Sequence, residues 1–383
     1  MLETIKFIRE NKDWREKLKQ PPYCISINED ENYALLKYSQ TDSDFNETIC
    51  RECRGLIIDL NKLTPVALSF YKFFNIGEEF ADKIYWKDCK VTEKIDGTKI
   101  LLWYDNYQNK WRISTSSMLD AKDAKVGDFG ITFEDLFNRA IIENLGENIL
   151  QDFDNIFNRL YCYTFELVSP ESRVVVPYKQ TKLYFIGVRN ITTFEEMNIE
   201  ICDKILSLFP TPKIYNLNTT KACLDNVEHM TYDHEGYVVV DKYFNRIKIK
   251  SPAYVQAHYL RNNGKVSKGK ILEIIEKNEQ DEFLAYFPEY KEYFDDIEDR
   301  YNKYREKASS AITRLNIQLE AHREDWTRKD IAKYINENEK EYSALLFNLL
   351  GTDLYKLYIN SEWSKLTKEQ KMIKLGLKEN KDE

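Results

Sequence analysis

The sequence predicts an α+β protein, in which antiparallel sheets flanked by helices are followed by an all-α domain. Between about residues 34 and 250, short apolar runs and helical patterns follow one another in irregular order, without the regular alternation of a parallel sheet. After Lys250 the apolar residues instead recur every three or four positions, as on one face of a helix. We therefore expect two domains, residues 1–255 and residues 256–383.

The elements of the first domain are predicted from local patterns. Runs of β-branched, aromatic and other apolar residues that end in turn signals are typical of strands. Such runs occur at residues 56–60, 66–70, 100–104, 111–115, 161–168, 183–188 and 237–241. Two segments with the period of a helix, residues 132–145 and residues 193–208, interrupt these strands.

The second domain is predicted to consist of helices. Apolar side chains at spacings of four and three form a stripe that would face the core of a helical bundle. The stripe comprises Tyr290, Phe294, Ile297, Tyr301, Tyr304, Ala308, Ile312, Leu315 and Leu319. Two further helices are expected at residues 328–350, where Gly351 would end the helix, and at residues 361–377.

Composition and charge exclude several classes of protein. The 383 residues include no apolar stretch near the ~20 residues that a membrane-spanning helix needs, and the charged N-terminus does not resemble a secretory signal. Seven scattered cysteines do not suggest a disulfide framework, which favours a cytoplasmic protein. The net charge of −8 disfavours indiscriminate coating of nucleic acid, so a phosphate-bearing ligand would need a local basic pocket.

The segment Val91-Thr-Glu-Lys-Ile-Asp-Gly-Thr98 carries the sharpest local signal for chemistry. It predicts an apolar strand that ends near Lys94 and turns at Asp96-Gly97. Taken alone, a hairpin turn with an exposed lysine is the better interpretation, because Asp-Gly is a common hairpin turn. The charged residues that follow in later strands change this balance.

Three later segments place charged side chains on apolar strands. Glu166 lies within the run at residues 164–168, and Glu235 precedes the run at residues 236–240. The two-residue period of a strand sends Lys248 and Lys250 to the same face. Two neighbouring ammonium groups are costly unless an anion lies between them, but lysines also protect solvated edge strands. Both interpretations of this lysine pair stand at this point.

In this order, the segments resemble the motifs of the covalent nucleotidyltransferase superfamily, which contains ATP-dependent ligases and mRNA capping enzymes. The similar segments are Lys94-Ile-Asp-Gly97 for the nucleophile motif, Phe165-Glu166 for the third motif, residues 183–189 for the strand after it, Glu235-Gly236 for the fourth and Lys248-Ile-Lys250 for the fifth. Upstream, Glu52-Cys-Arg-Gly55 and Lys72-Phe-Phe-Asn75 are similar to the phage-type RNA ligase 1 family, of which the phage T4 enzyme is the familiar member. The resemblance spans about Tyr38 to Tyr254.

The resemblance implies an ATP-dependent RNA ligase, with a nucleotidyltransferase (ATP-grasp-like ligase) domain and an all-helical domain that selects RNA. ATP and Mg²⁺ are the implied cofactors, and the implied partners are RNA 5′-phosphate and 3′-hydroxyl ends, as in cleaved tRNA or single-stranded RNA under repair. No protein partner is implied, and the cytosol of a phage-infected host would suit such an enzyme. The implied site residues are Lys94 as nucleophile; Tyr38, Arg54, Lys72, Glu93, Glu166, Val238, Lys248 and Lys250 for ATP; Glu235, Asp96 and, most weakly, Asp281 for the metal; and Tyr254 as a further site residue.

One departure and three alternatives accompany this resemblance. Family members commonly carry a basic residue where this chain has Ser114-Thr-Ser-Ser117, so Arg112 or Lys122 could replace that phosphate contact. A DNA ligase and an RNA capping guanylyltransferase usually have a small β-barrel after the fifth motif, whereas a helical period follows residue 251 here. A non-catalytic RNA-binding module on a ligase fold would have no need of the complete set of charged motif residues.

Overall fold

The structure, a computed structural model, describes residues 1–259, 266–322, 325–350, 359 and 362–377. The contacts between residues divide the chain into two units, residues 1–264 and residues 265–383. The boundary expected from the sequence, between residues 255 and 256, lies within the last helix of the first unit, α9 (Pro252–Tyr259). No helix among the described residues is both long and apolar enough to span a membrane.

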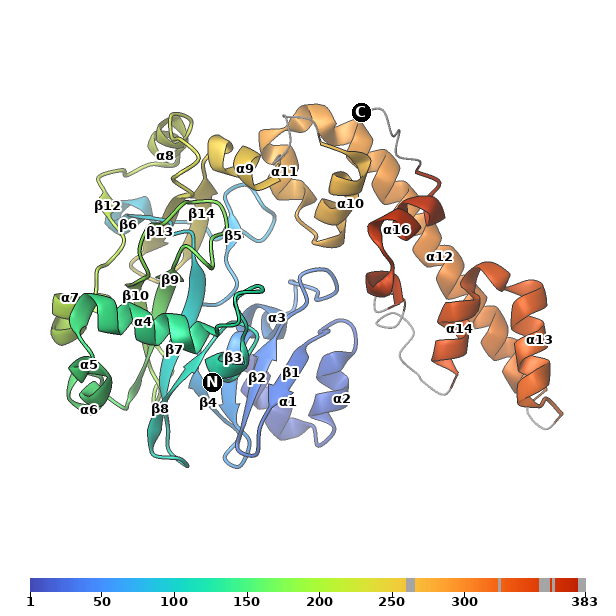
Figure 1. Ribbon diagram of the computed structural model, residues 1–383, viewed down its shortest axis with the longest axis horizontal. Coiled ribbons are helices and arrows are strands. Elements are labelled where there is room, and N and C mark those ends of the chain that lie inside the picture. The colour runs from blue at the N-terminus through green and yellow to red at the C-terminus, as the bar shows by residue number, and fades with distance from the viewer. Residues whose placement is uncertain (260–265, 323–324, 351–358, 360–361, 378–383) are drawn as a thin grey trace. The chain divides into compact units, whose positions relative to one another are not determined.

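Three sheets form the frame of the first unit (Figure 1). The first sheet is antiparallel and has the order β1 (Ser26–Glu29), β2 (Tyr33–Lys37), β3 (Arg54–Asp59), β4 (Thr64–Ala67). The second sheet is also antiparallel, in the order β11 (Glu196–Met197), β10 (Lys182–Asn190), β9 (Tyr161–Val168), β7 (Thr98–Asp105), β8 (Lys110–Ser114). The third sheet has the order β12 (Ile214–Tyr215), β6 (Cys89–Glu93), β13 (Gly236–Asp241), β14 (Arg246–Lys250), β5 (Phe74–Asn75), with β5 parallel to β14.

Helices cover these sheets and complete three apolar cores. The first sheet packs against α1 (Glu3–Glu10), α2 (Trp14–Lys19) and α3 (Thr48–Glu52). The second sheet packs against α4 (Phe133–Leu145), with α5 (Asn148–Gln151), α6 (Phe153–Ile156) and α7 (Asp203–Leu208) at its margins. The third sheet packs against α8 (Thr220–Val227). The α+β class with antiparallel sheets, expected from the sequence, is confirmed.

β7 is apolar without alternation because both of its faces are buried. Ile100 and Leu102 pack in the core beneath α4, whereas Leu101 and Trp103 pack against the first sheet. Successive side chains of a strand point to opposite faces, so a strand between two packed layers buries both sets. Each large apolar side chain buried in this way contributes roughly 1.5–3 kcal/mol. β7 therefore holds the second sheet rigidly between α4 and the first sheet.

One predicted helix of the first unit is wrong over most of its length. Residues 193–208 contain β11 and a 3₁₀ turn (Ile199–Ile201) before α7, and only α7 is α-helical. Met197 pairs with Val188 at the edge of the second sheet, and the carboxylate of Glu196 is held by Arg246. These tertiary contacts override the local helical period.

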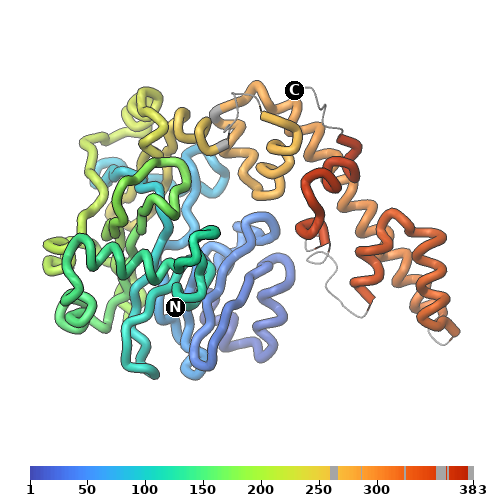
Figure 2. The backbone as a smooth tube through the Cα atoms, in the orientation of Figure 1, coloured from blue at the N-terminus to red at the C-terminus, as the bar shows by residue number. Residues whose placement is uncertain are grey.

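The second unit is helical, as expected. Its described helices are α10 (Lys268–Glu276), α11 (Gln280–Tyr286), α12 (Lys291–Ala321), α13 (Arg328–Asn338), α14 (Ser343–Leu349) and α16 (Lys368–Lys374). The predicted stripe lies on α12, the long orange segment in Figure 2, except for Tyr290, which lies in the 3₁₀ turn before it; Ala308, Ile312 and Leu315 of the stripe are buried in the core of this unit.

The helix predicted at residues 328–350 is interrupted. Glu339 leaves helical geometry with φ −132° and ψ 35°, and its buried carboxylate accepts a hydrogen bond of 2.9 Å from Nη2 of Arg314. The chain then passes through a 3₁₀ turn (Lys340–Tyr342) into α14. Gly351 and the first residue of the helix predicted at 361–377 lie outside the described residues.

Candidate active site

Lys94 directly follows β6, a strand of the third sheet, and begins the turn into β7. Its backbone N–H donates to the carbonyl of Gly236 at 2.8 Å, which fixes the start of the turn against β13. Its Nζ donates to Oε2 of Glu235 at 2.8 Å. The second oxygen of Glu235, Oε1, lies 3.6 Å from Nζ of Lys250, and Glu235 is buried. Three predicted site residues, far apart in sequence, therefore form one charged cluster.

Two glycines permit the close backbone contacts around this cluster. A Cβ on Gly97 would lie 2.4 Å from the carbonyl oxygen of Leu167, so any side chain there would separate β7 from β9. Gly236 has φ +132°, and a Cβ there would lie 2.1 Å from the carbonyl oxygen of Ile249. Both positions therefore require glycine.

Asp96 is engaged by the protein around it. Its Oδ2 accepts hydrogen bonds from the backbone N–H groups of Val175 and Val176, at 2.9 and 2.8 Å. Its Oδ1 accepts from the hydroxyl of Tyr254 at 2.8 Å. To bind a metal ion, Asp96 would have to give up some of these hydrogen bonds. A role in fixing the turn after Lys94 is consistent with all three of them.

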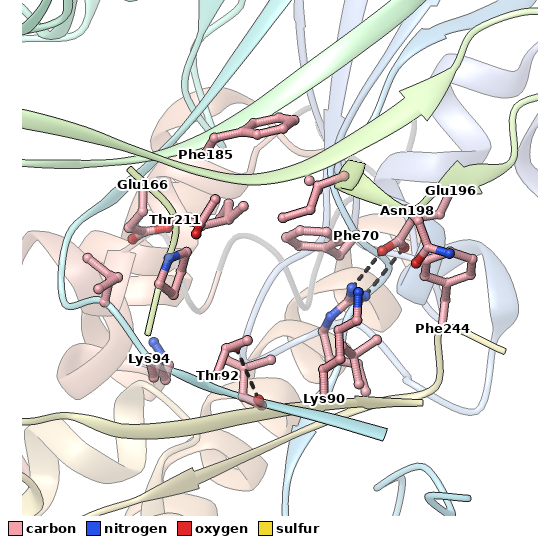
Figure 3. A pocket seen from close by; sticks show the side chains of 18 of the residues that line it. Phe70, Lys90, Thr92, Lys94, Glu166, Phe185, Glu196, Asn198, Thr211 and Phe244 are labelled. Atoms are coloured by element: carbon pink, nitrogen blue, oxygen red, sulfur yellow. Dashed lines mark hydrogen bonds and ion pairs between the residues drawn. The ribbon is translucent and has the colours of Figure 1, made fainter. Parts of the chain in front are cut away.

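A cavity of about 510 Å³ opens beside Lys94 and is lined from all three sheets. Lys94 and Glu166 project into it from facing elements, as Figure 3 shows. The predicted site residues in its wall are Arg54, Glu93, Lys94, Glu166 and Val238. Phe70, Phe73, Phe185 and Ile214 add apolar surface beside these polar groups. A concave wall of this mixed character is typical of a ligand site.

Glu166 is the carboxylate whose protonation this environment changes most clearly. Burial raises the pKa of Glu166 to about 7 and the nearby Glu235 acts in the same direction, whereas the ammonium of Lys94 and the guanidinium of Arg54 oppose the rise. A carboxyl group that titrates near neutral pH inside a cavity is typical of a functional site.

Further cations lie on the first sheet and on the loop after it. The guanidinium of Arg54 stacks on Phe73 at 4.7 Å, and its buried Nη1 has no hydrogen-bond partner among the described residues. Nζ of Lys72 donates to Oε1 of Gln40 at 2.9 Å and lies 5.0 Å from the ring of Tyr38. The structure thus brings Lys72 and Tyr38 together, although neither lines the cavity beside Lys94.

Arg112 and Lys122, the two candidates for a replacement phosphate contact, each lie beside carboxylates of the protein. Arg112 is buried and paired with Asp30 at 2.7 Å and Asp105 at 3.3 Å, so its charge is already neutralised. Nζ of Lys122 lies 3.3 Å from Asp120. The hydroxyl of Ser114 accepts from Trp103 and donates to the carbonyl of Leu119. None of these contacts points to a phosphate site.

Sequence reasoning assigns no role to several charged residues in the cavity wall, among them Arg246 and Lys99. Arg246 pairs with Glu196 through both guanidinium nitrogens and lies 4.0 Å from the ring of Phe70. Lys99 lies five positions after Lys94, within an apolar strand. A lysine inside such a strand was the available signal, because charged side chains are seldom buried without a partner.

Metal ligands are few in this region. In the parts of the chain that the structure describes, no three His, Cys, Asp or Glu side chains gather closely enough to hold a metal ion. Asp281 lies on α11 in the second unit. Within the first unit, Glu235 is the buried carboxylate that directly contacts Lys94.

Comparison with known proteins identifies the family. A family model described as RNA ligase, of the T4 RNA ligase 1 type, matches residues 52–254, just over half of the chain. The chain therefore belongs to this family of RNA ligases, which are enzymes. The matched range contains Lys94, Glu166, Glu235 and Lys250.

Individual relatives show how far the similarity extends. The RNA ligase of Rhodothermus phage RM378 is 24% identical over 388 residues, which cover 84% of each chain. The "Putative bifunctional polynucleotide kinase/RNA ligase" of Autographa californica nuclear polyhedrosis virus is 28% identical over 307 residues, and the match covers 76% of this chain but 42% of that protein. Among solved structures, an archaeal ATP-dependent RNA ligase matches with 13% identity and a TM-score of 0.45, over 76% of this chain and 78% of that one.

Proposed function

We propose that the protein is an ATP-dependent RNA ligase that works through a covalent lysyl-AMP. Nζ of Lys94 attacks the α-phosphorus of ATP, and a nitrogen–phosphorus bond forms as the bond to the β-phosphate oxygen breaks and pyrophosphate leaves. An RNA 5′-phosphate then takes AMP from Lys94, and an RNA 3′-hydroxyl displaces the AMP to form the phosphodiester. The observation that carries this proposal is the amine of Lys94, which lines the cavity and is held by Glu235.

The amine must give up a proton before or during attack. Glu235 accepts a hydrogen bond from Nζ of Lys94 at 2.8 Å, so its carboxylate is the nearest described acceptor for that proton. The same carboxylate lies 3.6 Å from Lys250. When the ATP phosphates arrive, Lys250 can exchange this contact for the α-phosphate and leave Glu235 to Lys94.

The roles of the other residues follow from the resemblance to the family, and four of these residues, Arg54, Glu93, Glu166 and Val238, also line the cavity. Lys248, on the same strand as Lys250, shares the α-phosphate, and Arg54 and Lys72 hold the leaving pyrophosphate, with Tyr38 as a weaker contact. The buried Nη1 of Arg54, which lacks a hydrogen-bond partner among the described residues, supports this assignment. Glu166 takes a ribose hydroxyl. Glu93 and Val238, both in the cavity wall, border the adenine.

Mg²⁺ fits this site through few protein ligands. Mg²⁺ keeps most of its water and is commonly bound by one or two carboxylates together with substrate phosphates. Glu235, a buried carboxylate between Lys94 and Lys250, is the residue that would hold it. When bound, Mg²⁺ neutralises phosphate charge. The engaged oxygens of Asp96 fit a role in fixing the turn better than a role as metal ligand.

The second unit is assigned to the RNA. The proposed nucleotide contacts lie between residues 38 and 250, and the helical unit begins after them. We assign this unit, residues 265–383, to orienting or selecting RNA ends, such as those of cleaved tRNA or single-stranded RNA. An action in the cytoplasm suits such substrates.

Incubation with α-labelled ATP and Mg²⁺, followed by a denaturing gel, tests the first step directly. The unmodified protein should retain the label, and Lys94→Arg should not, because a guanidinium stays protonated and cannot attack. Lys110→Arg, at an exposed lysine of β8, is the matched control and should label normally. A label retained by Lys94→Arg would remove Lys94 as the nucleophile, and labelling by GTP instead of ATP would favour a capping reaction.

A further inference from the structure

Lys99 is a buried lysine in the cavity wall to which the proposed reaction gives no role. It is the second residue of β7, and it is 9% exposed. Because side chains alternate along a strand, Lys99 faces the first sheet together with Leu101 and Trp103. An ammonium group in such an apolar layer is costly unless it has partners.

The partners of Lys99 connect two sheets at the edge of the cavity. Its Nζ donates to the backbone carbonyl of Arg54 at 3.0 Å and to the hydroxyl of Ser69 at 2.6 Å. Arg54 is the first residue of β3, and its side chain lines the cavity. Across the second sheet, Lys99 pairs in register with Glu166 on β9. Lys99 therefore fixes the backbone of one predicted ATP-binding residue and neighbours a second.

We propose that Lys99 is a positioning residue for the nucleotide: its ammonium group holds the Arg54 strand end and completes the positive wall that receives the phosphates. The proposal rests on the proposed function, since it needs a nucleotide in this cavity. Lys99 would supply, from inside the sheet, a positive charge that Ser114–Ser117 do not supply.

The charge of Lys99 depends on its surroundings. Burial lowers the pKa of Lys99 well below its ordinary value, Arg54 on β3 and Lys37 on β2 act in the same direction, and Glu166 and Cys162 on β9 oppose the change. An incoming polyanion favours the protonated form. Nucleotide binding should therefore weaken as rising pH removes the proton from Lys99.

The experiment measures affinity without reaction. The probe is an ATP analogue with a methylene group between the α- and β-phosphorus atoms, which Lys94 cannot cleave. Calorimetry from about pH 7.5 to pH 9.5 avoids the titration of the γ-phosphate, whose pKa is about 6. The proteins are the unmodified chain, Lys99→Met, Lys99→Arg and the control Lys110→Met, which removes an exposed lysine from the same sheet.

The expected results separate positioning from simple structural support. Lys99→Met should bind about tenfold or more weakly and without pH dependence, whereas Lys99→Arg should bind at every pH, because its charge is permanent. The unmodified protein and the Lys110→Met control should bind progressively more weakly as the pH rises. Circular dichroism checks that each variant is folded.

Several outcomes would overturn the proposal. A folded Lys99→Met with unchanged affinity and pH profile would do so. If Lys99→Met does not fold, a pH profile of Lys99→Arg that matches the unmodified protein would do the same. A flat profile in the unmodified protein would also overturn it, even if ATP still labels Lys94. Failure of the unmodified protein both to bind the analogue and to become labelled would instead overturn the proposed function and this inference together.

Discussion

Glu166→Gln should make the folded protein more stable near pH 8 while it impairs ligation. Burial raises the pKa of Glu166 to about 7 from an ordinary value of 4.5. In the unfolded chain the carboxyl group loses its proton near pH 4.5, whereas in the folded chain it keeps the proton until about pH 7. The folded state therefore binds more protons in this window, and the free energy of unfolding falls as the pH rises from about 4.5 to 7.

The size of the effect follows from that window. At about 1.4 kcal/mol per pH unit, the two pKa values correspond to at most about 3.5 kcal/mol. Part of the Glu166 side chain is exposed to solvent, and it faces a cavity. Screening by water should therefore reduce the change in the free energy of unfolding to about 1–2 kcal/mol. Glutamine has nearly the same shape and no charge, so it should not show this loss at high pH.

Urea unfolding at pH 4.5 and pH 8, followed by tryptophan fluorescence, provides the measurement. The difference in free energy of unfolding between Glu166→Gln and the unmodified protein should grow by about 1–2 kcal/mol between the two pH values. Glu143→Gln, at an exposed position of α4, controls for the loss of one negative charge. The same pH dependence in the unmodified protein and in Glu166→Gln would refute the reasoning.

Three further predictions test the site and the division of labour between the units. Lys250→Ala should lower the rate of AMP transfer about 10²–10³-fold in single-turnover assays, as for a lost transition-state donor, and an unchanged rate would remove Lys250 from the phosphate contacts. Gly97→Ala should lower both the unfolding midpoint and ATP labelling, because its Cβ would lie 2.4 Å from the carbonyl oxygen of Leu167; thermal unfolding and a labelling gel measure both effects, and normal values would contradict that close contact. A chain of residues 1–264 should still label with ATP but seal RNA more weakly than the full chain, with circular dichroism to confirm folding. If that folded fragment sealed every tested RNA as well as the full chain, the second unit would not have the role proposed here.

The parts of the fold that follow from local sequence could be predicted. β9 is mostly apolar, and the sequence predicts its bounds correctly; α4 begins after Thr132, whose side chain forms a capping box with Asp135. β11 could not be predicted, because two residues at a sheet edge carry no periodic signal and depend on partners such as Val188. Short edge strands are decided by tertiary contacts.

In the candidate site, too, the residue types could be predicted from the sequence but their contacts could not. Lys94 and Glu235 were recognised as separate motif residues, but their 2.8 Å contact depends on the pairing of β6 with β13, which one sequence does not specify. Arg112 was considered for phosphate binding because of its place in the chain. Its pairing with Asp30, 82 positions earlier, could not be read from that place. Lys99 remained unassigned for a related reason, since its partners come from a different sheet.

The three sheets of the first unit each supply a separate portion of the cavity wall. Arg54 comes from the first sheet, Glu166 from the second and Val238 from the third. A nucleotide in the cavity would contact all three sheets at once, and no single sheet provides the whole binding site. Because a ligand that binds only the native state stabilises it by mass action, ATP should raise the unfolding midpoint of the whole unit in one cooperative step. Chains in which any sheet is still undocked would be unable to take up the nucleotide, so adenylation would mark those molecules whose first unit is completely assembled.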